Sequence, residues 1–356
     1  MGTIHLFNPE NDLALAFGKK HFTAPAAAMA LHRAGALLPM WWAESNDLIL
    51  ATNDQADDVE FLKSRFGLNG QIATSQNIRS VTKASPWGWS EDAVAQLRAI
   101  GTPGEILPDK DSINIIRNLS HRRLTREVLK RMNVPERLLP IEFTDPQKAI
   151  AHIASNPNSF MKLPWSSSGR GILQCNKMPR KQIENYASGI IRRQGSLMIE
   201  PEYDKQKDFA ALFACNRDRL QFKALSAFAT NDHNAYDGNI IMSDNRIIDW
   251  LGTDPMPWIE RLQNALEPLL LNKYEGWLGI DMLTYTLPSD GKLQIAPCIE
   301  INLRTTMGVV SYHLRQKLAL SNRPAIFRIG RTAPPIESTL ILPPRDGFFF
   351  SIQPIA

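Results

Sequence analysis

Short apolar runs alternate with helix-like segments over the first hundred positions of the chain. The apolar runs that predict strands are residues 3–7, 37–43, 48–51 and 71–73. The segments that predict helices are residues 24–36, 57–66 and 91–100, the last of them with Ser90 as a plausible N-cap. Strands that alternate with helices are typical of a parallel α/β domain.

A polar turn, residues 8–12, follows the first predicted strand. Ligands of parallel sheets bind beyond the carboxyl ends of the strands, so Asn8, Glu10, Asn11 and Asp12 are candidates for a site. The same residue types also form turns for local reasons, and the pattern slightly favours that explanation. No G-x-G-x-x-G follows the strand, so a dinucleotide is not indicated.

A strand, a Ser/Gly-rich loop and a second strand are predicted between Phe160 and Gln174, with Lys162 on the first strand. Glycine lets the backbone approach a ligand closely, and N–H groups and serine hydroxyls can donate to phosphate. A flexible hairpin without a ligand is the alternative, and a Walker A loop is excluded because Gly-Lys-Ser/Thr is absent. The candidate donors are Ser166, Ser167, Ser168, Gly169, Arg170 and Gly171.

The most informative stretch is a predicted hairpin between Trp277 and Gly308, in which two apolar runs flank Asp290-Gly291. If these two residues form the loop, Asp281 lies opposite Glu300, with Cβ atoms roughly 5 Å apart. Pro297 cannot donate to a ladder, so a bulge could shift this register.

Side chains alternate along a strand, so Glu300, Asn302 and Arg304 share one face of the hairpin. Two carboxylates and an amide oxygen are hard ligands that suit Mg²⁺ held between protein and phosphates. A half-buried hairpin whose acids face water is the alternative.

The order Glu-x-Asn-x-Arg after an Asp-bearing strand resembles the C-terminal metal site of the ATP-grasp superfamily, which includes D-alanine–D-alanine ligase and biotin carboxylase. The resemblance covers roughly residues 105–315. It implies that Asp281, Glu300 and Asn302 bind one or two Mg²⁺ ions. It also implies that Arg304 contacts the transferred phosphate or the substrate carboxylate.

The resemblance also implies a set of nucleotide contacts. Arg122, near the start of an amphipathic helix over residues 120–132, stands where the family has a phosphate-contacting Lys, and Arg keeps the charge with another geometry. Lys162 matches the strand lysine and the loop after it the glycine-rich flap. Glu200 matches the hinge acid beside adenine and Asp208 the ribose-binding acid, with Lys223 as a further candidate. A solvated helix start and surface acids at strand ends are the alternatives.

Composition limits the remaining possibilities. The 356 residues suffice for two or three domains, which we expect over residues 1–110, 111–195 and 196–356. A net charge of +4 without a basic block does not point to nucleic acid, and no apolar run is long enough to span a membrane. Three scattered cysteines fit a reducing cytoplasm. The Pro-rich residues after 318 have few strand signals.

From the resemblance we expect an α/β (α+β) ATP-grasp enzyme with an N-terminal parallel α/β domain. It would be a ligase that uses ATP and Mg²⁺ to join a small-molecule or peptide carboxylate to an amine or thiol through an acylphosphate. Lys162 and Arg304 are the expected catalytic residues, the loop at 233–239 could cover the acceptor, and a homodimer is possible. A small-molecule kinase of the same family and a non-catalytic nucleotide-binding protein are the alternatives.

Overall fold

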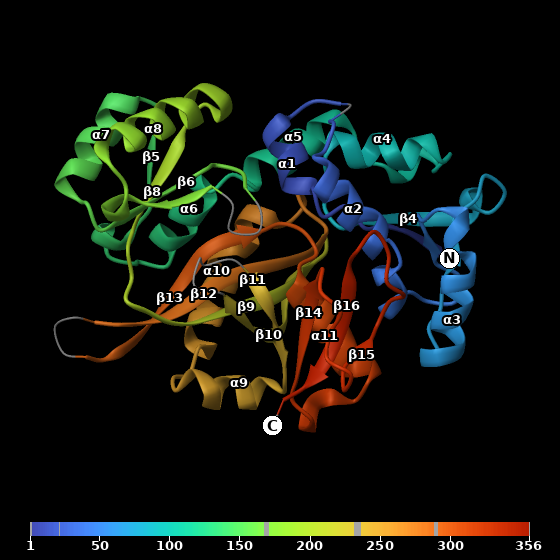
Figure 1. The fold of residues 1–356 in the computed structure, drawn as a ribbon. Helices are drawn as coiled ribbons and strands as arrows, with labels where there is room; N and C mark the ends of the chain where they lie inside the picture. The colour runs from blue at the N-terminus through green and yellow to red at the C-terminus, as the bar shows by residue number, and fades with distance from the viewer. Residues whose placement is uncertain (1, 21, 167–170, 231–235, 288–290, 356) are drawn as a thin grey trace.

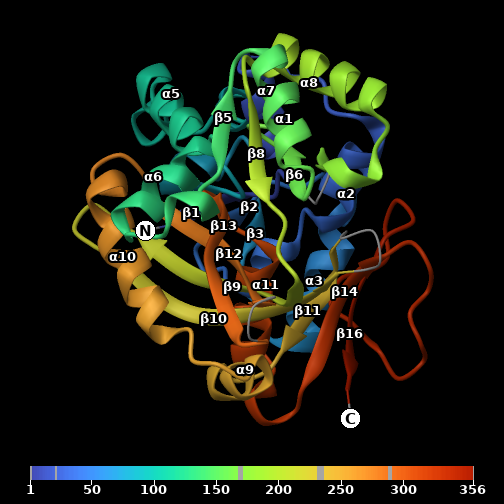
Figure 2. The same ribbon diagram turned by 90° about the vertical axis from the view of Figure 1, so that its left-hand side faces the viewer.

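The structure, a computed structural model, describes residues 2–20, 22–166, 171–230, 236–287 and 291–355. In these residues the strands form three sheets with helices packed against them (Figure 1). The view turned by 90° separates the small sheet and its helices at the top from the large sheet below (Figure 2). None of the helices in the described ranges is long and apolar enough to cross a membrane.

The first sheet is parallel, as the sequence predicts, with strand order β3-β2-β1-β4. Its strands are β1 (Gly2–Leu6), β2 (Leu48–Ile49), β3 (Gln71–Ile72) and β4 (Val81–Pro86). Its helices are α1 (Asn11–Phe17), α2 (Ala26–Gly35), α3 (Ala56–Phe66) and α4 (Glu91–Ala99). Ser90 caps α4 as expected, because its hydroxyl accepts from the N–H of Ala93.

The strand predicted over residues 37–43 is wrong. Leu38–Trp41 form a 3₁₀ helix whose four side chains are buried. A short apolar run predicts burial but does not distinguish a strand from a buried helical turn. Pro39, which has no N–H to donate, fits the first turn of a helix without loss.

The second sheet is small and antiparallel, with order β5-β8-β6-β7. Its strands are β5 (Ile141–Phe143), β6 (Ser159–Lys162), β7 (Ile172–Gln174) and β8 (Leu197–Pro201), and its helices are α7 (Pro146–Ser155) and α8 (Arg180–Gln194). The predicted strand–loop–strand is therefore confirmed as β6 and β7. Its loop residues Ser167, Ser168, Gly169 and Arg170 lie outside the described residues.

Two helices, α5 (Lys110–Leu119) and α6 (Arg123–Arg131), connect the first sheet with the second. The apolar stripe of α6 packs into the core beneath the large sheet, where Leu124, Val128 and Leu129 are buried.

The third sheet has eight strands in the order β13-β12-β9-β10-β11-β14-β16-β15. They are β9 (Lys205–Cys215), β10 (Leu220–Thr230), β11 (Tyr236–Ile241), β12 (Gly276–Thr286), β13 (Leu293–Asn302), β14 (Ala325–Gly330), β15 (Thr339–Leu340) and β16 (Phe349–Pro354). Its helices are α9 (Asp244–Leu251), α10 (Met256–Leu270) and α11 (Met307–Lys317). Residues 236–239 of the loop predicted at 233–239 belong to strand β11, and residues 233–235 lie outside the described residues.

The C-terminal tail contradicts the expectation of few strands, because β14, β15 and β16 extend the large sheet. Prolines at 334, 335, 343 and 344 lie between these strands and hide the pattern. The tail also ties the large sheet to the first one. Phe327, Ile341 and Phe350 pack in one core with Leu38 and Trp41, and the indole of Trp41 donates to the carbonyl of Ile341 at 3.2 Å.

The β12–β13 hairpin places Asp281 opposite Glu300, as predicted, but not through the predicted loop. Next to the turn Thr286 faces Leu293, so Asp290-Gly291 is not a two-residue loop. The register then shifts between Asp281 and Leu283, where β13 contains Pro297. The shift at the bulge cancels the offset at the turn, and the two acids face each other.

The connection between α5 and α6 buries a histidine in its neutral form. The Nδ1 of His121 accepts from the N–H of Arg123 at 3.0 Å, and its ring packs edge-on against Trp165. Burial, assisted by the charges of Arg123 and Arg117, lowers the pKa of His121 to about 3 from an ordinary value of 6.5.

We predict that this histidine makes the fold acid-sensitive. Between pH 6.5 and about 3, His121 binds a proton in the unfolded chain but not in the folded chain. The free energy of unfolding therefore falls as the pH falls, by about 1.4 kcal/mol per pH unit. Urea denaturation of His121→Gln should show a smaller loss of stability over this range than the parent. His152→Gln is the control, and equal pH profiles for all three proteins would contradict the assignment.

Candidate active site

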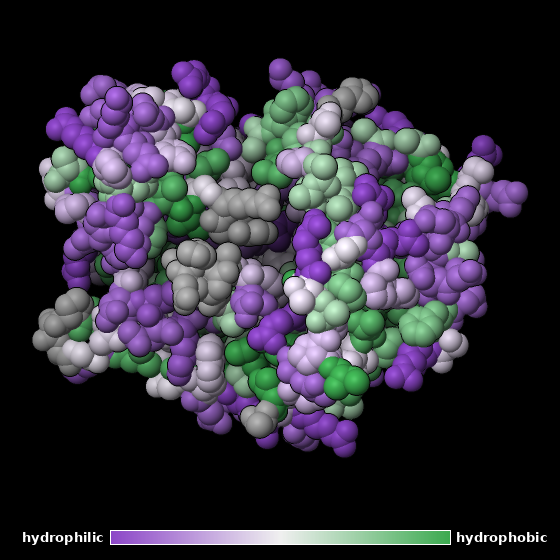
Figure 3. All heavy atoms as spheres, in the orientation of Figure 1, coloured by the Kyte–Doolittle hydropathy of each residue, from purple (hydrophilic) through white to green (hydrophobic). Residues whose placement is uncertain are grey.

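A cleft of about 830 Å³ opens where the three sheets meet. The space-filling view shows a hollow near the middle of the molecule at this junction (Figure 3). The small sheet contributes Lys162 and Glu200 to its lining, and the turn after β1 contributes Glu10. The large sheet contributes Asp208, Asp281, Glu300, Asn302 and Arg304. The structure thus gathers most of the candidate residues in one place.

The three residues predicted to hold metal lie on adjacent positions of β12 and β13. Asn302 donates through Nδ2 to Oδ2 of Asp281 at 3.1 Å, and its Oδ1 accepts from Arg304 at 2.9 Å. Arg304 also donates through Nε to Asp12 at 2.9 Å. A continuous chain of hydrogen bonds therefore runs from Asp281 on the large sheet to Asp12 on α1.

Arg122 lies at the start of α6 and reaches the same acids. Its guanidinium forms an ion pair with Glu300 at 2.7 Å and donates to the carbonyl of Leu163 at 2.9 Å and to the hydroxyl of Ser166 at 3.1 Å. Its Nη1 is buried without a partner in the described part of the chain. One donor of this arginine is therefore left for a ligand.

At the small-sheet end of the cleft Lys162 on β6 and Glu200 on β8 form a buried ion pair. The other oxygen of Glu200, Oε1, is buried and has no partner among the described residues. Asp208 lines the cleft at the start of β9, where Lys205 donates to it at 2.7 Å. Gly171, directly before β7, has a φ of +76°, a conformation that suits glycine.

The turn after β1 combines local structure with a contact to the site. Asn8 donates to the carbonyl of Gly88 at 2.9 Å and accepts from its N–H at 3.3 Å, which supports the structural interpretation of this residue. A Cβ on Gly88 would lie 2.3 Å from Nδ2 of Asn11, so the two loops pack at a distance that glycine permits. Asp12, in contrast, reaches Arg304.

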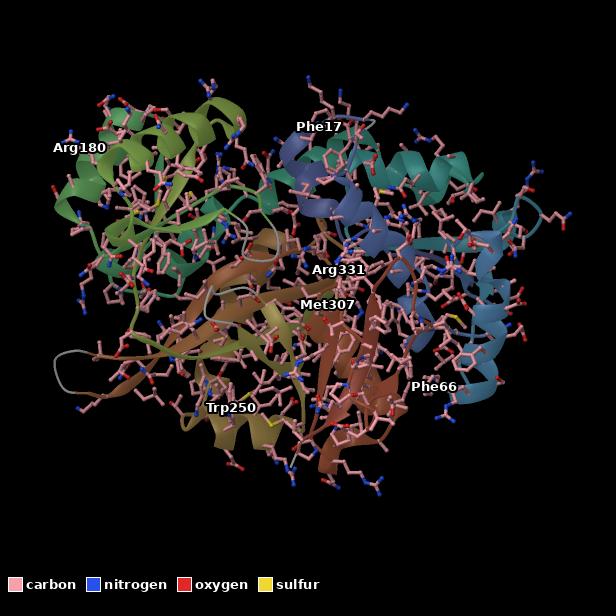
Figure 4. The ribbon with its side chains drawn as sticks, viewed as in Figure 1. Phe17, Phe66, Arg180, Trp250, Met307 and Arg331 are labelled. Carbon is pink, nitrogen blue, oxygen red and sulfur yellow. The ribbon has the colours of Figure 1, made fainter. Side chains whose placement is uncertain are left out.

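The far end of the cleft is walled by apolar side chains and contains one buried acid. Glu10 is 3% exposed, and its Oε1 is hydrogen-bonded to Nδ1 of His32 at 2.9 Å. The other oxygen of Glu10, Oε2, has no partner among the described residues. Figure 4 places Met307 and Arg331 beside this end, near the middle of the molecule. The apolar wall is formed by Leu13, Ala27, Ala28, Leu31, Met307 and Ile329.

Lys223 is the described candidate that the structure places elsewhere. It lies on β10, donates to Gln221 at 2.8 Å and lines a second cavity rather than this cleft. It lies nearer the start of β10 than Ser226 and Phe228, the residues of this strand that line the cleft, and the register of β10 shifts between Phe222 and Ala224. Such an irregularity cannot be foreseen from the alternation of residues along a strand.

Burial and like charges act against ionisation of the acids in this cleft. Burial and the carboxylate of Glu300 raise the pKa of Asp281, and Arg304 and Arg122 oppose the rise. Burial also raises the pKa of Asp12, which Arg304 counteracts. The acids in turn raise the pKa of both arginines despite the burial of these guanidinium groups. The cations thus hold together acids that would otherwise repel one another.

The donor set fits a hard divalent cation. Two opposed carboxylates and an amide are available, and a bound cation would offset the repulsion that raises the pKa of Asp281. No group of three or more His, Cys, Asp and Glu side chains suited to a metal occurs in the described residues. The remaining ligands would therefore come from phosphates or water.

Sequence reasoning missed His32, Arg331 and Met307. His32 lies on α2, Arg331 follows β14, and Met307 begins α11 shortly after Arg304. The first is brought to the cleft by α2, and the second by β14, which the sequence does not predict. No signal in the sequence connects these positions with Glu10.

The fold is similar to that of several solved structures. N5-carboxyaminoimidazole synthase from Aspergillus clavatus, in complex with ADP and 5-aminoimidazole ribonucleotide, matches with a TM-score of 0.53 at 13% identity, over 99% of this chain and 94% of the other. Biotin carboxylase from Campylobacter jejuni matches with a TM-score of 0.54 at 11% identity, over 99% and 86%. A putative ATP-grasp superfamily protein from Archaeoglobus fulgidus gives 0.51 at 12%, over 100% of both chains. No protein-family model and no curated protein sequence matches this chain.

We predict that Arg122 stabilises the protein mainly by compensating Glu300. Arg122→Ala should lower the free energy of unfolding by about 3 kcal/mol, because it leaves a largely buried carboxylate without its partner. The double variant Arg122→Ala/Glu300→Gln should regain part of this loss, because the glutamine is neutral. Urea denaturation measures both, and equal losses would show that the ion pair is not what Arg122 contributes.

Proposed function

Because the chain has the ATP-grasp fold, we propose that it is an ATP- and Mg²⁺-dependent ligase that joins a carboxylate to an amine. One observation carries this proposal. Two buried polar atoms without partners among the described residues, Glu10 Oε2 and Glu200 Oε1, belong to residues that line a single cleft, which the opposed pair Asp281 and Glu300 also lines. Arg122, whose Nη1 also lacks a partner among the described residues, is ion-paired with Glu300. Buried polar groups normally have partners, so these atoms indicate where ligands bind.

ATP would occupy the small-sheet end of the cleft. Glu200 would contact adenine and Asp208 the ribose, and both residues line the cleft. Arg122, Lys162 and the flap between β6 and β7 would hold the phosphates, because each supplies N–H or O–H donors. Lys162 would exchange its ion pair with Glu200 for one with a phosphate.

Asp281, Glu300 and Asn302 would hold Mg²⁺ beside these phosphates. When bound, the ion would neutralise phosphate charge and orient the terminal group. Similar structures support the nucleotide and the metal, since they contain ADP, ATP or MgADP. Asn302 and Arg304, which are hydrogen-bonded to each other, would keep the metal ligands and the transferred phosphate in a fixed relation.

Arg304 would bind the acceptor carboxylate during phosphoryl transfer. A carboxylate oxygen forms a bond to the γ-phosphorus, the bond to ADP breaks, and an acylphosphate results. Arg304 and Arg122 would stabilise the charge that develops on the transferred group. Asp12, Thr305 and Asn302 would fix the orientation of Arg304, because they accept from its Nε, Nη1 and Nη2, and the substrate would share or replace one of these contacts.

The pair Glu10 and His32 would serve the amine step of a ligation. An amine that attacks the acylphosphate forms the amide bond, releases phosphate and must lose a proton. The unpartnered oxygen of Glu10 borders the apolar end of the cleft, where it could bind an ammonium group and receive this proton. A kinase that acts on a hydroxyl group could use the same carboxylate as its base. The products in the experiment below therefore distinguish the two activities.

We predict that Lys162→Ala weakens ATP binding by roughly 1.5–3 kcal/mol, because one charge-assisted hydrogen bond is lost. Isothermal titration calorimetry measures the affinity. Lys207→Ala, on β9 and absent from the lining of the cleft, should bind ATP as the parent does. Unchanged affinity of the Lys162 variant would count against this nucleotide site.

The reaction class can be tested by a phosphate-release screen with pairs of small acids and amines, followed by mass spectrometry of the products. Ligation predicts ADP and free phosphate together, only when both substrates are present. Glu300→Gln should abolish turnover, and Glu10→Gln should slow it by about tenfold to a thousandfold with ATP affinity unchanged. A stable phosphorylated product without free phosphate would establish a kinase instead.

A further inference from the structure

A second cavity of about 390 Å³ lies between the first sheet and the large sheet. One wall is the face of β1 and β4, and the other is formed by the ends of β9, β10 and β12. Trp87 lines both this cavity and the cleft, and the two share no other described residue. The second cavity is therefore a separate compartment, with none of the groups that the proposed ligase mechanism uses.

The wall from the first sheet is polar. Thr3 is paired with Lys83 and His5 with Ser85 across the parallel strands, so these four side chains point to the same face. A parallel sheet is normally covered on both faces by apolar residues, so a face with Lys, His, Ser and Thr needs another explanation.

The opposite wall is hollowed by a small residue. Gln221, Ala214 and Trp277 lie side by side on β10, β9 and β12, and the methyl group of Ala214 leaves a gap between the two longer side chains. Lys223 extends along the same wall and donates to Gln221 at 2.8 Å.

Two tryptophans form an aromatic side of the cavity. Trp42 and Trp277 both pack against His313, with ring centroids 5.3 Å and 5.6 Å from it. The Trp42 ring also meets His5 edge-on at 6.4 Å. Packing behind both indoles fixes their orientation, so the aromatic surface is preformed.

The charges of the lining are predominantly positive. Lys83, Arg219 and Lys223 line the cavity, and Glu275 is the one acid among its described lining residues. Glu275 already forms an ion pair with Arg217 at 2.8 Å. The described lining residues therefore give the cavity a positive electrostatic potential, which favours the binding of an anion.

His5 provides a buried group that points to a ligand. It is 6% exposed, its Nε2 is hydrogen-bonded to Asp47 at 3.1 Å, and its Nδ1 has no partner among the described residues. Burial acts against the charge of Asp47, but hydrogen bonds from His5 and two backbone N–H groups lower its pKa to about 2. Asp47 is thus an acceptor for Nε2–H, and Nδ1 is left to a second partner.

We propose that this cavity binds a small aromatic anion, a planar ring that carries a phosphate or carboxylate group. The ring would stack against Trp42 and Trp277, and the anionic group would meet Lys83, Arg219 and Lys223. Nδ1 of His5, an acceptor when Nε2–H donates to Asp47, would accept from a hydroxyl group of the ligand, such as the P–OH of a singly protonated phosphate. A volume of this size suits a compact ligand rather than a nucleoside triphosphate.

Phenyl phosphate is a probe that combines both features, and calorimetry can measure its binding to the full chain. Lys223→Gln and Arg219→Gln should each weaken binding by about tenfold, and both variants should melt like the parent because neither side chain is buried. Lys162→Gln, which alters the cleft and not this cavity, should bind the probe unchanged. Inorganic phosphate and phenol should each bind more weakly than phenyl phosphate.

Three results would overturn the proposal. The first is no binding by the parent up to about 10 mM, weaker than any affinity that a preformed site of this kind should have. The second is a loss of binding in Lys162→Gln alone, which would place the probe in the cleft. The third is equal affinity for inorganic phosphate and phenyl phosphate, which would exclude a role for the ring. None of these results depends on whether the protein is a ligase.

Discussion

The compensation of buried charges is the constraint on which the rest of this structure depends. Burial and the carboxylate of Glu300 raise the pKa of Asp12 and of Asp281, and Arg122 and Arg304 oppose both rises. A buried pair contributes little net stability compared with apolar packing, yet it is costly to break. The arrangement therefore specifies which elements must come together more than it stabilises the fold.

These ion pairs connect segments that lie far apart in the sequence. Arg304 joins β13 to α1, and Arg122 joins α6 to β13 and to the flap. Lys162 and Glu200 remain within the small sheet, whose core is separate from the others. A ligand that replaced one of these contacts would change how one sheet is held against another. Binding and domain position are for this reason coupled in this cleft.

The sequence predicts the fold class and the opposed acids of the hairpin because both depend on local patterns, whereas Lys162, Glu200 and Asp208 are expected as nucleotide contacts only from the family resemblance. The alternation of strands and helices up to Phe66 and the acids of the β12–β13 hairpin follow from residue spacing. The prediction that Asp281 faces Glu300 is confirmed although the predicted two-residue loop is wrong, because the bulge at Pro297 restores the register. What the sequence does not predict depends on packing between distant segments. The strands of the tail, the contact of Arg304 with Asp12 and the position of Lys223 in the second cavity belong to this class.

The eight-stranded sheet is open, so its two outermost strands each expose a row of backbone groups that could recruit another chain. Both carry features that prevent it. β15 is only two residues long and is followed by Pro343 and Pro344, and β13 contains Pro297, which removes a donor from its ladder and bends it. The bulge that brings two acids together thus also protects the sheet against aggregation. A substitution that regularised β13 would place the protein at risk of edge-to-edge association even if its own fold survived.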